Sequence, residues 1–298
     1  MKRKVTTAVF FAAHPSFSLD EAATALTPCG GRTGTVERLK HHLKTGRLRL
    51  VARCVYVVVP AGIDAEKFQP DPILVAAAAR SDAVFSHHSA LELLGAAHSV
   101  WREFTLWTAK QRRAIYLGEN SIRFLIHPAQ MRAGKEGSFG TRRIERRGRF
   151  ITVTGPERTL VEGFRRPRLV GGLEELIVSA SGFPTLDFDL LLGVLRRYGN
   201  ANLWAATGWF LERFQKTFHV PDSFLKRMER RCPRSPQYME RGLRGGSLAT
   251  RWNVIVPQEV AKLGEPNDIN DAGRMAEHPA ILWKTHNVRE HFKLQRKK

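Results

Sequence analysis

The stretch of residues 18–59 constrains this chain most, because its capping and turn signals follow one another in a fixed order. Ser18 and Glu21 have the S-x-x-E spacing of a capping box, so the sequence predicts a helix that begins directly after Ser18. Pro28, followed by Gly30 and Gly31, predicts the end of that helix and a turn. The stretch therefore begins with a helix and a turn, and a second helix is expected to follow.

This second helix is predicted to begin near residues 33–35 and to end at Gly46. Val36, Leu39 and Leu43 recur at helical spacing, which predicts one buried stripe. On a wheel of ~100° per residue, the opposite face carries small, polar and basic residues, namely Gly34, Arg38, His41 and Thr45. A helix with one buried stripe and such an outer face is suited to the major groove of DNA.

A β-hairpin is predicted after the second helix. Leucine and arginine alternate over residues 47–50, so the side chains of Arg47 and Arg49 are expected to point away from the core. The second arm, residues 55–58, has the composition of a buried strand. Arg53 lies in the connection, where a cation can reach a phosphate or the minor groove. The order helix, turn, helix and hairpin predicts a winged helix-turn-helix domain over residues 1–60.

The net charge points to the same class of partner. The 298 residues include 48 Lys and Arg against 28 Asp and Glu, which gives a formal charge of +20. Such a charge favours a polyanionic partner, most simply nucleic acid. Residues 1–60 hold ten Lys and Arg against three acids, and thus only +7 of this charge. Further basic surface is therefore expected in the rest of the chain.

The sequence also predicts a cytoplasmic protein without a membrane helix. No run approaches the ~18 consecutive apolar residues of a membrane helix. Residues 1–13 resemble a secretory signal, but two threonines break their apolar run, and a first helix of the winged domain is favoured. That helix would carry Val5, Val9, Ala12 and Ala13 on one side. The three cysteines form no C-x-x-C pair, which favours a reducing compartment: Cys29, Cys54 and Cys232.

A second domain is predicted after a proline-punctuated linker at residues 61–72. Residues 73–257 show a buried helix, then short strands, then helices, which predicts a mixed α+β domain. The predicted fold class is thus α+β, with a winged helix-turn-helix before the larger domain. Residues 258–298 are predicted to be a basic, loosely ordered tail. One basic run is interpreted either as a solvated loop or hairpin, or as a source of further phosphate contacts. It comprises Arg142, Arg143, Arg146, Arg147 and Arg149.

No catalytic residue, metal site or cofactor is predicted. His87, His88 and Ser89 have no partner at the spacing of a metal site or a catalytic triad, and Ser89 with Glu92 predicts a capping box. A nuclease that uses Mg²⁺ is the enzymatic alternative. Its candidate ligands are Glu157 with Glu162, or Asp187 with Asp189, although neither pair shares one face of the expected helices.

Four strings in order resemble the AbiEi family, the antitoxins and transcriptional regulators of type IV toxin–antitoxin modules, which are linked to phage defence. They are the CVYV strand at residues 54–57, HSALELLG at 88–95, TGPERTLVE at 154–162 followed by Gly171 and Gly172, and RWNVIVP at 251–257. The resemblance covers residues 18–257. The family commonly has glycine where this chain has Cys54, and aspartate where it has Glu162. Residues 262–298 lie outside the resemblance.

The resemblance implies a repressor that binds inverted repeats in its own promoter and counteracts a nucleotidyltransferase-like toxin, with or without a stable complex. Double-stranded DNA and that toxin are the expected partners. A plain transcription factor with a ligand-sensing second domain fits the composition equally well. Five residues are expected to face base edges and nearby phosphates, namely Arg32, Thr33, Thr35, Arg38 and His41. Arg49 and Arg53 are expected to contact the DNA backbone through the wing.

Overall fold

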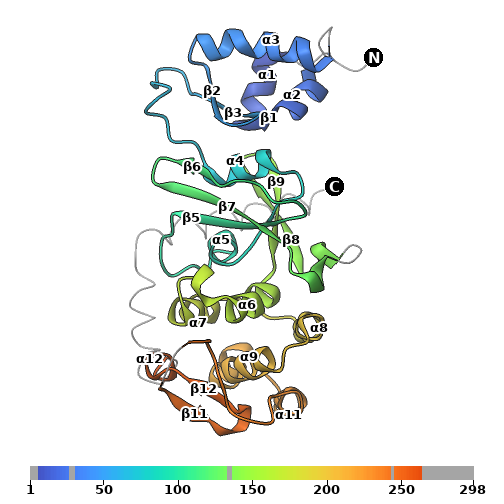
Figure 1. The fold of residues 1–298 in the computed structure, drawn as a ribbon, viewed down its shortest axis with the longest axis vertical. Helices are drawn as coiled ribbons and strands as arrows, with labels where there is room; N and C mark the ends of the chain where they lie inside the picture. The colour runs from blue at the N-terminus through green and yellow to red at the C-terminus, as the bar shows by residue number, and fades with distance from the viewer. Residues whose placement is uncertain (1–5, 27–30, 133–135, 243–244, 264–298) are drawn as a thin grey trace, which may run out of the picture.

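The computed structural model describes residues 6–26, 31–132, 136–242 and 245–263. Its parts are stacked along the longest axis of the molecule (Figure 1). A unit of helices and short strands lies at one end, a six-stranded sheet lies in the middle, and helices with a small three-stranded sheet lie at the other end. The fold class is α+β, as the sequence predicts.

The N-terminal unit contains the predicted helices and hairpin in the predicted order, together with a short strand, β1, that was not predicted. It comprises α1 (Thr7–Ala13), β1 (Ser16–Ser18), α2 (Leu19–Leu26), α3 (Gly31–Lys44), β2 (Leu48–Ala52) and β3 (Val55–Val58). The capping box forms, because Ser18 Oγ accepts from the Glu21 N–H at 3.1 Å and the Glu21 carboxylate accepts from the Ser18 N–H at 2.7 Å. α3 begins at Gly31, earlier than predicted, while Pro28 and Gly30 lie outside the described residues.

The buried face of α1 differs from the predicted one. Phe10 and Phe11 are buried, whereas Val9 is 61% exposed. Ala12 and Ala13 are also exposed, and Val5 lies outside the described residues. The two phenylalanine rings lie 5.0 and 5.7 Å from the ring of Phe17 in β1. Aromatic rings bury more apolar area than alanine or valine, so they determine how the helix is rotated.

The sheet of the N-terminal unit, in the order β1-β3-β2, is covered on both faces. On one face Phe17 and Tyr56 pack with residues of α1, α2 and α3. On the other face Val55 and Val57 join a hydrophobic cluster with Ile73 of α4 (Pro72–Ala79). The N-terminal unit and the next part of the chain thus share a core. The predicted linker forms turns within residues 61–67 and irregular chain over residues 68–71, and Pro72 already begins α4.

The central sheet has the strand order β6-β7-β5-β4-β9-β8. The β5–β7 and β4–β9 pairs are parallel, and the other neighbours are antiparallel. The predicted basic run forms the hairpin of β8 and β9. The bounds of the elements are β4 (Val84–Phe85), α5 (His88–Leu93), β5 (Glu103–Thr108), β6 (Ile115–Leu117), β7 (Asn120–Ile126), β8 (Thr141–Arg146) and β9 (Arg149–Thr154).

The second predicted capping box does not form. α5 begins at His88, so Ser89 lies inside the helix and its Oγ accepts from the Thr105 N–H of β5 at 2.8 Å. His87 precedes the helix with a φ of 55°, and its side chain makes no capping bond. Tertiary pairing with the sheet therefore outweighs the local capping signal at this helix.

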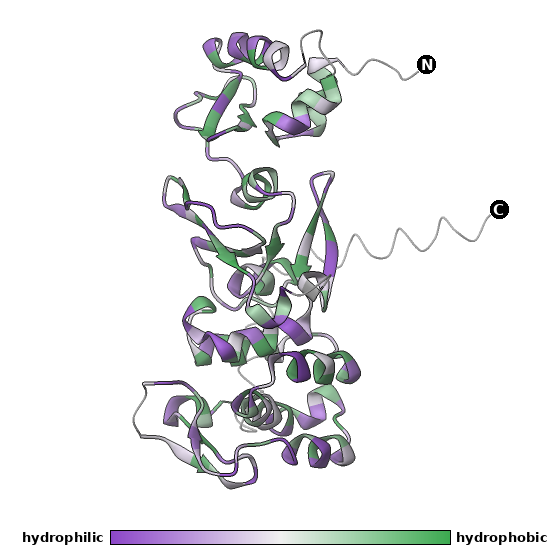
Figure 2. Ribbon diagram, turned by 45° about the vertical axis from the view of Figure 1, so that its right-hand side comes forward, coloured by the Kyte–Doolittle hydropathy of each residue, from purple (hydrophilic) through white to green (hydrophobic). Residues whose placement is uncertain are grey.

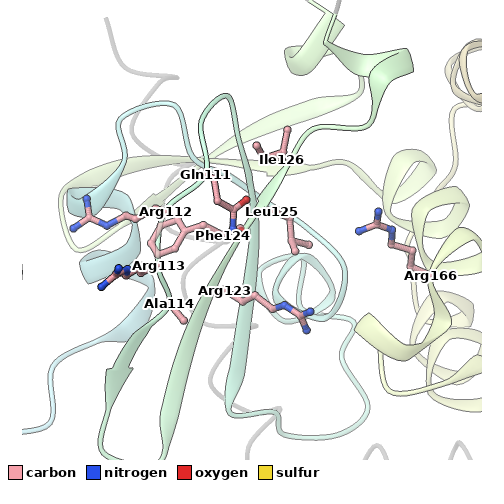
Figure 3. Close-up of a pocket in the computed structure, with 9 residues that line it drawn as sticks. All are labelled: Gln111, Arg112, Arg113, Ala114, Arg123, Phe124, Leu125, Ile126 and Arg166. Atoms are coloured by element: carbon pink, nitrogen blue, oxygen red, sulfur yellow. Dashed lines mark hydrogen bonds between the residues drawn. The ribbon is translucent and has the colours of Figure 1, made fainter.

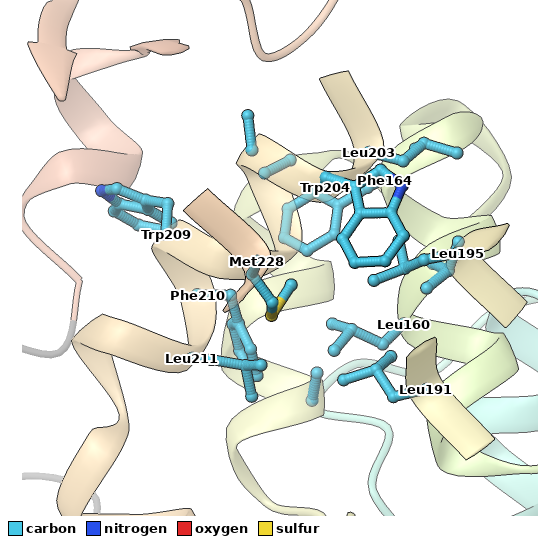
Figure 4. Packing of buried hydrophobic residues seen from close by; sticks show 14 of the residues in the cluster. Leu160, Phe164, Leu191, Leu195, Leu203, Trp204, Trp209, Phe210, Leu211 and Met228 are labelled. Carbon is cyan, nitrogen blue, oxygen red and sulfur yellow. The ribbon is translucent and has the colours of Figure 1, made fainter. Parts of the chain in front are cut away.

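The helical layer follows the central sheet along the chain, with α6 (Pro156–Arg165) and α7 (Leu173–Ser181) nearest to it (Figure 1). Its core contains Leu160, Phe164, Leu195, Phe210 and Met228 (Figure 4). The remaining elements are α8 (Phe188–Tyr198), α9 (Ala201–Arg213), α10 (Gln215–Phe218), α11 (Asp222–Glu229), β10 (Gln237–Tyr238), β11 (Ser247–Ala249), β12 (Val254–Val256) and α12 (Gln258–Ala261). Short 3-10 turns occur at Ala129–Met131, Glu136–Ser138, Pro167–Leu169 and Thr250–Trp252.

The predicted tail begins with ordered structure rather than with loose chain. Val260 of α12 is buried, and Arg213 donates hydrogen bonds to the carbonyl oxygens of Ala261 and Leu263. These contacts attach residues 258–263 to α9, and the rest of the predicted tail lies outside the described residues. Within the described ranges, no helix combines the length and the apolar character that crossing a membrane requires.

Candidate nucleic-acid interface

The outer face of α3 is the main basic surface of the N-terminal unit. Arg38 and His41 are both exposed on it. Figure 2 shows α3 as a hydrophilic helix at one end of the molecule. Its sequence contains four Lys and Arg and one acid, Glu37, which forms an ion pair with Lys40 at 2.6 Å. In the described part of the chain, no carboxylate forms an ion pair with Arg38, so its guanidinium remains available to a ligand.

The first turn of α3 carries Arg32 and Thr33, which are both exposed. The Arg32 guanidinium forms an ion pair with Asp20 of α2, and its Nη2 lies 3.8 Å from Cys54 Sγ at the hairpin turn. Asp20 therefore balances part of the charge of Arg32. Cys54 has a φ of 62°, a left-handed conformation that glycine adopts readily. The hairpin thus has at this position a backbone that suits glycine.

The expectation that Thr35 faces DNA is wrong. Thr35 is fully buried, and its hydroxyl donates to the Gly31 carbonyl oxygen at 2.9 Å. Thr35 lies one turn before Leu39, which is also fully buried in the core of the N-terminal unit. Residues one turn apart share a helix face, so Thr35 belongs to the buried side of α3.

Arg49 does not point freely into solvent either. This half-buried residue donates through Nη1 to the Ala65 carbonyl oxygen at 2.7 Å and approaches the Glu66 carbonyl oxygen at 3.4 Å. The expected phosphate contact of Arg49 is therefore replaced by a contact with the segment that precedes α4. Arg53 is exposed at the hairpin turn, and its carbonyl oxygen accepts from Arg112 Nη2 at 3.2 Å. The tip of the hairpin thus contacts the central sheet region.

Three further cations of the N-terminal unit are exposed and were absent from the predicted set, namely Lys40, Lys44 and Arg47. The Arg47 guanidinium lies 5.5 Å from the ring centre of Phe11. Burial and the Arg47 charge lower the pKa of His42. Two signals in the sequence identify these three cations. Lys40 and Lys44 have i, i+4 spacing, and Arg47 follows Gly46 directly.

The arginines of the β8–β9 hairpin mostly serve contacts within the protein. Arg149 Nη1 donates to the Ser16 carbonyl oxygen at 3.1 Å, and Nη2 contacts the Glu21 carboxylate and the Ala77 carbonyl oxygen. Arg146 Nε lies 2.7 Å from the carboxylate of Asp71. These two side chains join the central sheet to the N-terminal unit and to the start of α4. They are therefore engaged within the protein rather than exposed to a phosphate backbone.

A buried polar cluster lies between the central sheet and the helical layer. The Glu162 carboxylate accepts from Trp107 Nε1 at 2.8 Å, Arg158 Nε at 2.7 Å and the Tyr198 hydroxyl at 2.6 Å. Burial alone would raise the pKa of the Glu162 carboxyl, but the Arg158 charge and these hydrogen bonds outweigh it and lower that pKa. Burial lowers the pKa of the neighbouring His87 to about 4. The cluster is thus a buried ion pair between Arg158 and Glu162, in which Trp107 and Tyr198 donate two further hydrogen bonds to the carboxylate.

The carboxylates considered as Mg²⁺ ligands do not form a common metal site, and three of them make structural contacts instead. Glu157 accepts from the Asp187 N–H at 2.8 Å, and Asp187 caps α8 by accepting from the Leu190 N–H at 2.9 Å. Asp189 has a side chain that is 95% exposed. Among the described residues, no group of three or more His, Cys, Asp and Glu is arranged to hold a metal ion.

Comparisons with known proteins bear on the fold alone. No family model matches the chain, and no curated protein matches its sequence. Among solved structures, the crystal structure of the RV2827C protein from Mycobacterium tuberculosis is similar, with a TM-score of 0.52 and 14% sequence identity. The match covers 81% of this chain and 86% of that protein.

Proposed function

We propose that the protein is a DNA-binding transcriptional repressor that reads its operator with α3. In this proposal the N-terminal unit is a winged helix-turn-helix, α2 and α3 are its paired helices, and β2 with β3 forms the wing. The observation that carries the proposal is the outer face of α3, where Arg38 and His41 are exposed while Leu39 anchors the helix in the core. A helix held in this way can enter the major groove with its outer face against base edges.

The distribution of charge supports this proposal. Arg38 has the geometry to bind the O6 and N7 atoms of guanine with two hydrogen bonds. Lys40, Lys44 and Arg47 are exposed nearby and would contact phosphates on either side of the groove. Arg53 at the hairpin turn would add a backbone contact. Because phosphate contacts release counterions, operator affinity is expected to fall steeply with increasing salt concentration.

We further propose that this repressor is the antitoxin of a type IV toxin–antitoxin module in the cytoplasm. The support is the set of AbiEi-like strings, of which ERTLVE lies within α6 and VIV forms β12. The second part of the chain would counteract a nucleotidyltransferase-like toxin encoded beside it. The inverted repeats of its own promoter would be the operator.

A mobility-shift assay on the intergenic DNA upstream of the gene tests the DNA-binding proposal. Arg38→Ala is expected to weaken operator binding by about 1–3 kcal/mol and to relax specificity at one base pair. Arg53→Ala is expected to weaken binding to all sequences alike. The matched control is Arg230→Ala, because Arg230 is exposed at the end of α11, far from α3 (Figure 1). Wild-type protein that does not bind this DNA, or unchanged binding by Arg38→Ala, would contradict the proposal.

A plain transcription factor with a ligand-sensing second part is the second candidate. A pocket along β7 favours it, because Arg123 and Arg166 line that pocket at a distance from α3. Coexpression with the neighbouring gene separates the two candidates. An antitoxin restores growth when that gene product is toxic, and a plain transcription factor that represses another promoter does not. A nuclease is not proposed, because Glu157, Glu162 and Asp187 are engaged in structural contacts.

A further inference from the structure

A pocket opens where one edge of β7 is left unpaired. β6 pairs only with residues 120–122 of β7, whereas β5 pairs with residues 121–126 on the other side. The edge of residues 123–126 is therefore not covered by a strand. A cavity of about 470 Å³ lies along it and is called here the β7-edge pocket. Its lining comprises Gln111, Arg112, Arg113, Ala114, Arg123, Phe124, Leu125, Ile126 and Arg166 (Figure 3).

The lining of the β7-edge pocket is cationic. Four of its nine residues are arginines and none is acidic. Arg123 extends from β7, while Arg166 follows α6, and in Figure 3 their guanidinium groups approach the same region from opposite sides. Arg112 and Arg113 flank the other side of the strand. Their guanidinium groups point away from Arg123 and Arg166, so a ligand beside β7 would meet chiefly Arg123 and Arg166 (Figure 3).

Carboxylates neutralise little of this charge. Arg123 lies 3.4 Å from Glu103, with half of its side chain exposed. In the part of the chain that the structure describes, Arg113 and Arg166 form no ion pair with an acid. Burial and the charges of Arg165 and Arg123 lower the pKa of Arg166, and they outweigh the opposite effect of Tyr198 and Glu162. Like charges that acids neutralise only in part favour the binding of an anion.

Aromatic rings hold two of the guanidinium groups in place. Arg166 lies 5.6 Å from the ring centre of Trp107, and Arg112 lies 5.8 Å from that of Phe124. Arg112 also donates to the carbonyl oxygens of Ala79 and Arg53 at 3.2 Å. Arg112 is therefore engaged within the protein, whereas Arg166 is held against a ring and loses less conformational freedom when it binds an anion.

We propose that the β7-edge pocket binds a small phosphorylated ligand with at least two negative charges, such as a nucleoside diphosphate or triphosphate. The guanidinium fork matches the oxygen atoms of a phosphate, which accept two parallel hydrogen bonds from it. The cavity volume lies within the usual range of small-molecule sites, about 300–1,000 Å³. Leu125 and Ile126, which are both partly exposed, offer apolar contacts beside the charges. The proposed site is separate from α3 and does not depend on the DNA-binding proposal.

Isothermal titration calorimetry of the full chain tests this site, with ATP and inorganic pyrophosphate as probes and adenosine as the uncharged control. ATP and pyrophosphate are expected to bind with a stoichiometry of one, and adenosine is expected not to bind. Arg123→Gln and Arg166→Gln are each expected to weaken ATP binding about tenfold, because each removes a charged hydrogen-bond donor. Arg168→Gln is the matched control, since Arg168 is exposed close to Arg166 but does not line the pocket.

Operator binding by the same variants separates a small ligand from a DNA contact. The proposal expects Arg123→Gln and Arg166→Gln to bind operator DNA as the wild type does. No saturable binding of ATP or pyrophosphate would overturn it, and so would equal ATP binding by both variants and the wild type. Variants that bind ATP normally but lose operator affinity would assign the pocket to the DNA backbone. In that outcome the small-ligand site is refuted, while the DNA-binding proposal stands.

Discussion

Glu162 shows how a single buried charge is stabilised in this protein. Its carboxylate is 1% exposed and lies 2.7 Å from the Nε of Arg158, which is fully buried. Trp107 and Tyr198 supply two more donors. Removing one partner of a buried ion pair leaves the other charge without compensation, and this costs more than the pair itself contributes.

Glu162→Gln is therefore expected to lower the free energy of unfolding by about 3 kcal/mol. Tyr198→Phe, which removes one neutral donor and keeps the ion pair, is expected to cost about 2 kcal/mol. Urea denaturation followed by circular dichroism measures both values. Equal losses for the two variants would show that the charge of Glu162 does not matter.

His87 makes stability depend on pH. Burial lowers the pKa of its ring from 6.5 to about 4, so the folded protein keeps the ring neutral. Below pH 6.5 the unfolded chain binds a proton that the folded protein does not, and stability falls as the pH approaches 4. A shift of this size corresponds to a loss on the order of 3 kcal/mol. Burial also lowers the pKa values of His88 and His127, so these two residues change stability with pH in the same direction as His87.

Urea midpoints measured between pH 7.5 and pH 4.5 test this dependence. The wild type is expected to lose stability across that range, and His87→Gln, which cannot titrate, is expected to lose less. The comparison uses the slope of stability against pH, so a constant cost of the substitution does not affect it. Parallel slopes in the two proteins would mean that other groups cause the loss.

At the scale of elements, α2 depends on its capping box. Ser18 Oγ and the Glu21 carboxylate each accept a backbone N–H that would otherwise lack a partner. Ser18→Ala is expected to reduce the free energy of unfolding by about 1 kcal/mol. Ser223→Ala on α11 is the matched control, because Ser223 is exposed and its helix shows no side-chain capping bond. A loss no larger than that of the control would contradict the role of the box.

The rotation of α3 leads to a separate prediction. Thr35 is buried and its hydroxyl bonds only within its own helix. Thr35→Val is therefore expected to keep operator affinity within about twofold, in contrast to Arg38→Ala. The same mobility-shift assay measures both. A folded Thr35→Val protein with strongly reduced affinity would place this side of α3 against DNA.

The sequence predicted the elements that are determined by residues close together in the chain. It did not predict the contacts between residues that are distant in the chain. The Ser18 box, α4 and the β8–β9 hairpin follow from neighbouring residues. Arg49 instead bonds a carbonyl oxygen 16 residues away, which no periodicity indicates. The β7-edge pocket depends on where β6 stops pairing and on Arg166 from another layer. Strand register and the contact between layers are properties of the assembled fold.

For the whole molecule, Arg149 joins parts that are far apart in sequence. It contacts Glu21, 128 residues away, and the Ala77 carbonyl oxygen, 72 residues away. Arg149→Met keeps the apolar stem and removes the charged donors. It is expected to destabilise the protein by about 2 kcal/mol, and to make residues 61–71 more sensitive to proteolysis.

Limited proteolysis with mass analysis of the fragments tests this role. Arg147→Met is the matched control, because Arg147 is exposed at the turn of the same hairpin. Cleavage between the N-terminal unit and α4 should be faster in Arg149→Met than in this control. Identical cleavage patterns would mean that the apolar packing of Val55 and Val57 is sufficient to hold the two parts together.

The sheet β1-β3-β2, covered on both faces, has a thermodynamic consequence for the proposed DNA binding. A DNA-reading unit on a flexible tether must lose orientational entropy when it binds, whereas this unit has already lost it on folding. Its operator complex should therefore form with a small heat-capacity change and with little new protection against hydrogen exchange outside α3. The dominant entropic signal would be the release of counterions from the duplex.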